Sequence, residues 1–147
     1  MLKKALLIIL IVGAGIQFIP VPINQSDEIL KTDFFQIVEA SLNIQQVVKA
    51  SCYDCHSNNT NYPWYGRVRP FAWFLQKHIR EGKEDLNFSD FQDYSGRMKR
   101  EKIRSMISQV RDGEMPLQEY LWMHPEAKLS EKETEQLIQF FENLNTQ

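Results

Sequence analysis

Apolar residues recur every three or four positions along most of the chain, and this spacing predicts amphipathic helices. Residues 34–51 fit one or two helical segments, the later of which runs directly into Cys52. A second helix is expected over residues 70–80, with Gly82 as its stop signal. No stretch alternates between apolar and polar residues for long enough to require a strand. The pattern therefore predicts an all-α fold.

Two further helices have clear end signals. The segment GRMKREKIRSMISQVRDG has an apolar face, Asp93 or Ser95 as its N-cap, and Gly113 to close it. Ser130 and Glu133 form a capping box that opens a last helix, which runs to about residue 144. The seventeen residues between these two helices, 114–130, contain two prolines and no sustained period. They are expected to form a long loop, and such loops in small domains are usually functional.

The first 23 residues differ in kind from the rest of the chain. Lys3 and Lys4 precede the run ALLIILIVGAGI, which is the pattern of an export signal. If Gln17 and two prolines are tolerated, the run approaches the ~20 residues that cross a bilayer. We favour an uncleaved membrane anchor over a cleaved signal peptide. In either case the body is expected on the periplasmic side, with residues 24–33 as a tether and 34–147 as one domain.

Composition narrows the classes of function. The net charge is -2, 24% of the residues are charged, and no basic stripe offers a footprint for nucleic acid. The densest basic stretch, residues 97–104, alternates with apolar residues and is expected to be a solvated helix face. The aromatic content of 12% is high for so small a body. A large flat group to pack against would explain it.

The two cysteines of the chain lie three positions apart and are followed at once by a histidine, in the pentapeptide CYDCH. Cys52 and Cys55 can capture the vinyl groups of a haem as thioethers, while His56 is held next to the iron. The C-x-x-C-H pattern is a signature of c-type haem attachment for this reason. The sequence therefore predicts a covalent haem c with His56 as the proximal ligand.

Three other uses of the cysteines compete with haem. A Cys52–Cys55 disulfide suits an exported chain but leaves His56 without a role. A thioredoxin-like pair needs a βαβ setting, which the helical pattern does not provide. A zinc site needs four ligands, and only His78 and His124 are available to complete the set.

The sixth iron ligand must come from far along the chain. Met115 precedes a proline in the long loop and is the first choice, with His78 and His124 as alternatives. A histidine–methionine pair would raise the reduction potential. Met98 and Met106 of the third helix are expected to fill the core. Aromatic and basic residues close to the thiols are candidates for the haem pocket: Tyr62, Trp64, Arg67 and Trp73.

Three segments carry a resemblance to a known family: SCYDCHSNNTNYPWY, RPFAWFLQKHIREGKEDLNFSDF and GEMPLQEYLWMHPEAKLSEKE. Together they resemble the haem-binding domain proteins, which are small cytochrome-c-like modules. The resemblance covers most of residues 52–133. It implies covalent haem c on Cys52 and Cys55, with His56 as an axial ligand.

These observations favour an electron carrier over an enzyme, with other redox proteins as partners. The alternative is a haem-based sensor or a peroxidase-like domain in which the sixth position of the iron is open. The sequence contains no evident acid–base set for such chemistry, so this alternative ranks lower. A structural domain that holds a disulfide or zinc is the third hypothesis.

Overall fold

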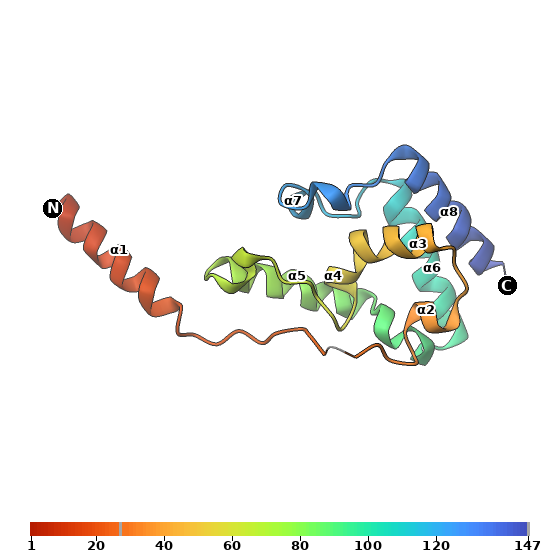
Figure 1. Ribbon diagram of the computed structural model, residues 1–147, viewed down its shortest axis with the longest axis horizontal. Helices are drawn as coiled ribbons and strands as arrows, with labels where there is room; N and C mark the ends of the chain where they lie inside the picture. The colour runs from red at the N-terminus through yellow and green to blue at the C-terminus, as the bar shows by residue number, and fades with distance from the viewer. Residues whose placement is uncertain (27, 147) are drawn as a thin grey trace.

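The structure is a computed structural model that describes residues 1–26 and 28–146, and its regular elements are helices. Figure 1 shows α1 standing apart from a body in which α3, α6 and α8 lie together. Within the described residues β-pairing is limited to one isolated bridge, Gln25 with Asn59. The all-α prediction is confirmed. The α-helices are α1 (Leu2–Ile16), α2 (Phe34–Ile37), α3 (Leu42–Val48), α4 (Asp54–His56), α5 (Phe71–Asp85), α6 (Gly96–Arg111), α7 (Gln118–Leu121) and α8 (Glu131–Asn145).

Side-chain caps start α6 and α8 where the sequence places them. Ser95 accepts a hydrogen bond from the backbone N–H of Met98 and opens α6, and Gly113 follows that helix with φ at +68°. Ser130 and Glu133 form the expected capping box of α8. The predicted third and last helices are therefore confirmed, and they pack against each other along their lengths.

An aromatic cluster centred on Phe34 fills the core. The Phe34 ring is fully buried and meets Phe88 and Phe91 edge-on, with centroids 5.3 and 4.9 Å away. Edge-to-face pairs of this kind add to the gain from burial alone. The other buried members of the cluster come from α3, α6, α8 and the segment after α5: Ile44, Val48, Leu86, Ile103, Met106, Ile107, Leu137 and Phe141.

Two local predictions need correction. Gly82 does not stop α5, which continues to Asp85. A Cβ at Gly82 would lie 2.9 Å from the carbonyl oxygen of Cys55, so the glycine allows α5 to approach the cysteine turn, residues 52–56, closely. The expected loop over residues 114–130 contains two short helical turns, α7 and the 3₁₀ turn η4 (Pro125–Ala127).

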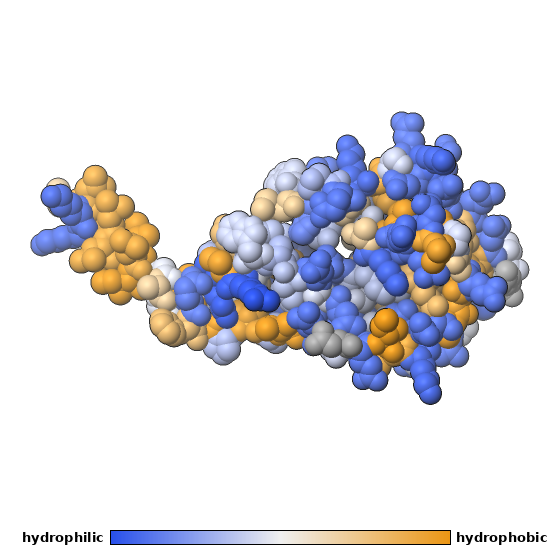
Figure 2. Space-filling view, in the orientation of Figure 1, coloured by the Kyte–Doolittle hydropathy of each residue, from blue (hydrophilic) through white to orange (hydrophobic). Residues whose placement is uncertain are grey.

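The N-terminal helix α1 has no buried residue, and Figure 2 shows it as a largely apolar rod. None of the helices in the described part of the chain has both the length and the hydropathy to cross a membrane. The helix ends at Ile16, and the next side chain, Gln17, forms two hydrogen bonds with the backbone of Arg69. One amide side chain thus joins this end of α1 to the chain just before α5.

Residues 24–33, expected to be a tether, are hydrogen-bonded to the body at several points. The Asn24 side chain donates to the carbonyl oxygen of Ser57 at 2.7 Å and accepts from Lys83 Nζ at 2.6 Å. Further along, Thr32 donates to the carbonyl oxygen of Ser89. The described residues of this segment therefore fasten the loop that follows His56 to α5, rather than serving as a free linker.

The core makes a direct prediction about stability. Leu137 is fully buried, whereas Leu42 is 77% exposed, and both are in helices. Leu137→Ala should lower the free energy of unfolding by about 2–5 kcal/mol, since it leaves a cavity. The control Leu42→Ala should change it by less than about 0.5 kcal/mol. Urea denaturation followed by circular dichroism measures both, and equal losses would contradict this description of the core.

Candidate functional site

The cysteine turn follows α3 without a break. A π-helical stretch, η1 (Lys49–Tyr53), joins α3 to α4, and π turns of this kind are frequent at functional sites. Tyr53, the first residue between the cysteines, stacks on Phe88 with centroids 4.9 Å apart and donates to Asp33. The motif is therefore anchored in the aromatic core through one of its own inner residues.

The imidazole of His56 is oriented by the backbone. Its Nδ1 lies 3.1 Å from the carbonyl oxygen of Leu86, just beyond the end of α5. Because a carbonyl can only accept, the proton resides on Nδ1 and the lone pair on Nε2. A ligand histidine is commonly held in this way by its second nitrogen. Burial also lowers the pKa of His56, which favours the neutral form that binds iron.

Both cysteines are free thiols, and both are half-buried. Burial raises the pKa of Cys52 to about 12 and that of Cys55 to about 11. Each thiol therefore keeps its proton at neutral pH, and its nucleophilicity is low.

Two adjoining hollows lie beside the turn. The cysteine cavity, about 300 Å³, is lined by Cys52, Cys55 and His56 together with residues of α5 and of the segment that begins at Met115. The aromatic cavity, about 410 Å³, is mainly apolar and includes Trp64, Tyr65, Phe71, Phe74, Trp122 and Met123. Four residues line both: Cys55, His78, Leu117 and Tyr120. Volumes of this size are typical of cofactor pockets.

The candidates for a sixth ligand are placed differently. Met115 and His78 both line the cysteine cavity, so each shares a hollow with His56. Both ring nitrogens of His124 are engaged, Nε2 with the Tyr65 hydroxyl at 2.7 Å and Nδ1 with Glu126 at 3.1 Å. His124 lines neither cavity. The geometry favours Met115 or His78.

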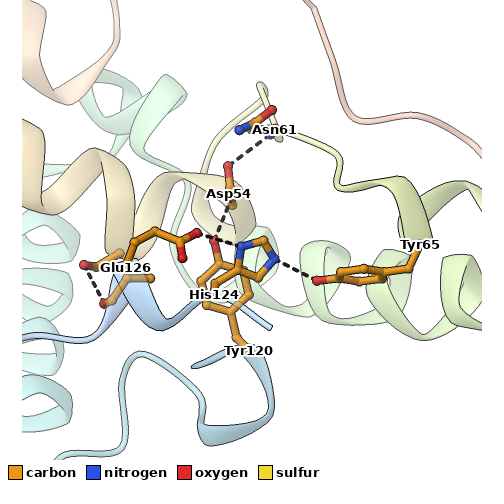
Figure 3. Close-up of polar contacts among 8 residues, drawn as sticks. Asp54, Asn61, Tyr65, Tyr120, His124 and Glu126 are labelled. Atoms are coloured by element: carbon orange, nitrogen blue, oxygen red, sulfur yellow. Dashed lines mark hydrogen bonds and ion pairs between the residues drawn. The ribbon is translucent and has the colours of Figure 1, made fainter. Parts of the chain in front are cut away.

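A polar network joins the cysteine turn to the segment after α6 (Figure 3). The Tyr120 hydroxyl donates to Asp54 Oδ2 at 2.7 Å, and the backbone N–H of Asn61 donates to Oδ1 at 3.0 Å. The Tyr120 ring stacks on His124 with centroids 4.3 Å apart. Burial and the bond to Asp54 raise the pKa of Tyr120, so its hydroxyl remains a donor. Asp54, the second inner residue of the motif, therefore faces away from the core.

Three residues expected in the haem pocket are not brought to either cavity. The Tyr62 hydroxyl binds the backbone of Asn24 and the side chain of Gln76, so it holds the N-terminal segment to α5 instead. Arg67 and Trp73 are exposed and line neither hollow, whereas Trp64 does line the aromatic cavity. Met98, expected in the core, is 43% exposed, while Met106 is buried as expected.

Sequence reasoning missed several residues that shape the site. Gly82 gives the cysteine turn its close approach to α5, and the Leu86 carbonyl orients His56. A signal for Gly82 existed, because it lies four residues after His78 and so on the same face of a helix. Nothing local marked Leu86 or the pairing of Asp54 with Tyr120.

Zinc binding, one of the competing uses of the cysteines, would need further ligands beside the two thiols. The described residues contain no group of three or more histidine, cysteine or acidic side chains arranged to hold a metal ion.

A third hollow, about 680 Å³, lies between residues 39–44 and α8. Its lining has no cysteine, histidine or methionine, so it offers no haem chemistry.

The residues fit a bound haem: two thiols and an imidazole share one hollow, with Met115 and His78 in the same lining. This helical fold and this site define a haem protein. A family model described as a haem-binding domain matches residues 11–143, and the chain belongs to that family. No curated protein and no solved structure was found to match the chain.

The raised thiol pKa values predict slow alkylation that accelerates steeply with pH. In the haem-free chain the rate of reaction with iodoacetamide should rise about tenfold per pH unit from about pH 7 to beyond about pH 9, because only the thiolate reacts. An ordinary thiol, with a pKa near 8.5, levels off there. The same chain in urea supplies that comparison. A plateau near pH 9 in the folded chain would contradict the burial of both thiols.

Proposed function

We propose that the protein is an exported c-type cytochrome that carries single electrons. One haem would be attached to Cys52 and Cys55, with His56 as the proximal ligand and Met115 as the distal ligand. The observation that carries this proposal is the shared lining of the cysteine cavity, which contains both thiols, His56 and Met115. When bound, haem supplies a one-electron couple between ferrous and ferric iron.

The residues of the chain would bind the haem covalently and limit its contact with water. Each thiol adds across one vinyl group, sulfur to one carbon and hydrogen to the other, so nothing leaves and no oxidant is consumed. The aromatic cavity would exclude water from one face of the porphyrin, which lowers the local dielectric and tunes the potential. The exposed rings of Trp64, Phe71 and Trp122 would surround the site at which redox partners make brief contact.

Support for export comes from the N-terminus. Helix α1 is apolar after Lys3 and Lys4, and its side chains are almost all exposed. We propose that it directs the domain across the cytoplasmic membrane and either stays as an anchor or is removed. Mass spectrometry of the mature chain would show whether residues 1–23 remain.

Covalent attachment is tested by expression alongside a cytochrome maturation system. Haem should stay with the polypeptide after denaturation and acid extraction, and the pyridine haemochrome spectrum should indicate two thioether bonds. Cys52→Ala or Cys55→Ala should shift that spectrum towards one free vinyl group, and the double variant should lose all covalent haem. Ser105→Ala, at an exposed position on α6, is the control. A colourless chain with both thiols free or joined would overturn the proposal.

The distal ligand is tested by Met115→Ala, with Met98→Ala as the matched methionine control. We expect the first to abolish the methionine-to-iron charge-transfer band and to lower the reduction potential, since thioether ligation favours ferrous iron. The second should change neither. If His78→Ala alters the spectrum instead, His78 is the ligand. Rapid carbon monoxide binding by the reduced wild type would favour the open-site sensor or peroxidase-like alternative.

A further inference from the structure

The segment between α6 and α8, residues 112–130, has little apolar anchorage. Ala127 is its one buried residue, and none of the four residues of α7 is buried. Segments with few buried contacts open at low free-energy cost. The position of this segment must therefore depend on its hydrogen bonds to the rest of the chain.

Those bonds are unevenly distributed. At the start, the backbone N–H groups of Glu114 and Met115 donate to the carbonyl oxygen of Gln109, within α6. At the end, Ser51 donates to the carbonyl oxygen of Ala127. Between them, the path across the cavities is held by side chains at Tyr120 and His124.

Of these two side chains, Tyr120 is the one that forms a hydrogen bond to the cysteine turn. Its ring lines both cavities, and its hydroxyl donates to Asp54, which lies between Cys52 and Cys55 in the motif. The carboxylate is fixed from its other side by Asn61, and the Asp54 carbonyl oxygen accepts from Thr60 at 2.6 Å. Figure 3 shows Asp54 between Asn61 and Tyr120. A rigid anionic acceptor makes this a strong hydrogen bond.

We propose that Tyr120 is a positioning residue, and that its bond to Asp54 holds residues 115–124 closed over the cysteine cavity. The effect of this hydrogen bond on ligand exchange at the iron rests on the proposed function, in which this segment carries the distal ligand Met115. Asp54 and Tyr120 then connect the two sides of the cofactor: the turn that supplies His56 and the segment that supplies Met115.

The first test measures amide hydrogen exchange by mass spectrometry on the full chain. Tyr120→Phe should speed exchange across residues 115–124 by about tenfold or more, because a hydrogen bond to a charged group is lost. Exchange in α6 and α8 should rise less, because it also occurs through openings that leave this bond intact. The control Tyr62→Phe also loses a tyrosine hydroxyl bond, but one made to Asn24 and Gln76, and should leave residues 115–124 as in the wild type.

A double-variant cycle tests the pairing itself. If Tyr120 acts through Asp54, Tyr120→Phe combined with Asp54→Asn should exchange no faster than the more affected single variant. Additive effects would overturn the pairing. Unchanged exchange in Tyr120→Phe, or a rise no larger in residues 115–124 than in α6 and α8, would overturn the positioning role.

The haem-loaded chain gives a readout that general destabilisation would not move. Imidazole must displace the distal ligand to bind ferric iron, so Tyr120→Phe should raise its rate of binding about tenfold, whereas Tyr62→Phe should not change it. An unchanged rate would overturn the effect on iron. The hydrogen-exchange assay tests the positioning role of Tyr120 whichever residue binds the iron. The Met115→Ala spectra test which residue is the distal ligand. The two proposals can therefore fail separately.

Discussion

The close approach of the cysteine turn to α5 is the constraint on which the site depends. The carbonyl oxygen of Cys55 would lie within 2.9 Å of any Cβ at position 82, so only glycine permits this separation without a shift of the backbone. With α5 at this distance, the Leu86 carbonyl just after its end can meet Nδ1 of His56. The same contact places His78 beside the thiols. Orientation of the imidazole and shape of the cavity thus follow from one backbone contact.

The two inner residues of the motif divide the remaining contacts between them. Tyr53 stacks within the aromatic core and binds the N-cap residue Asp33, while Asp54 turns outwards and binds Tyr120. A single helical turn therefore connects the aromatic core to a segment that has few buried residues. Packing around Phe34 fixes the positions of the two thiols. Hydrogen bonds determine where the segment after α6 lies relative to them.

The features predicted well from sequence are those encoded locally. Helices α6 and α8 each have an apolar period and a serine cap, and α6 also has a glycine stop, and all of these signals are local in sequence. The roles of Gly82 and Tyr62 were missed because they depend on partners far away in the chain, Cys55 in one case and Asn24 in the other. The cysteine motif could be recognised because its ligands are adjacent. The candidates for a distal ligand could not be reduced to one residue from sequence, since all three lie outside the motif and only the fold separates His124 from Met115 and His78.

The near absence of buried residues between α6 and α8 has an evolutionary consequence. Ala127 is the one buried residue of that stretch and Leu129 packs half-buried against the core, so its exposed positions can change without damage to the packing of α6 on α8. Selection can therefore change the side chains of this segment while the packing of the helices stays intact. Related chains are free to diverge at those positions and still share one architecture.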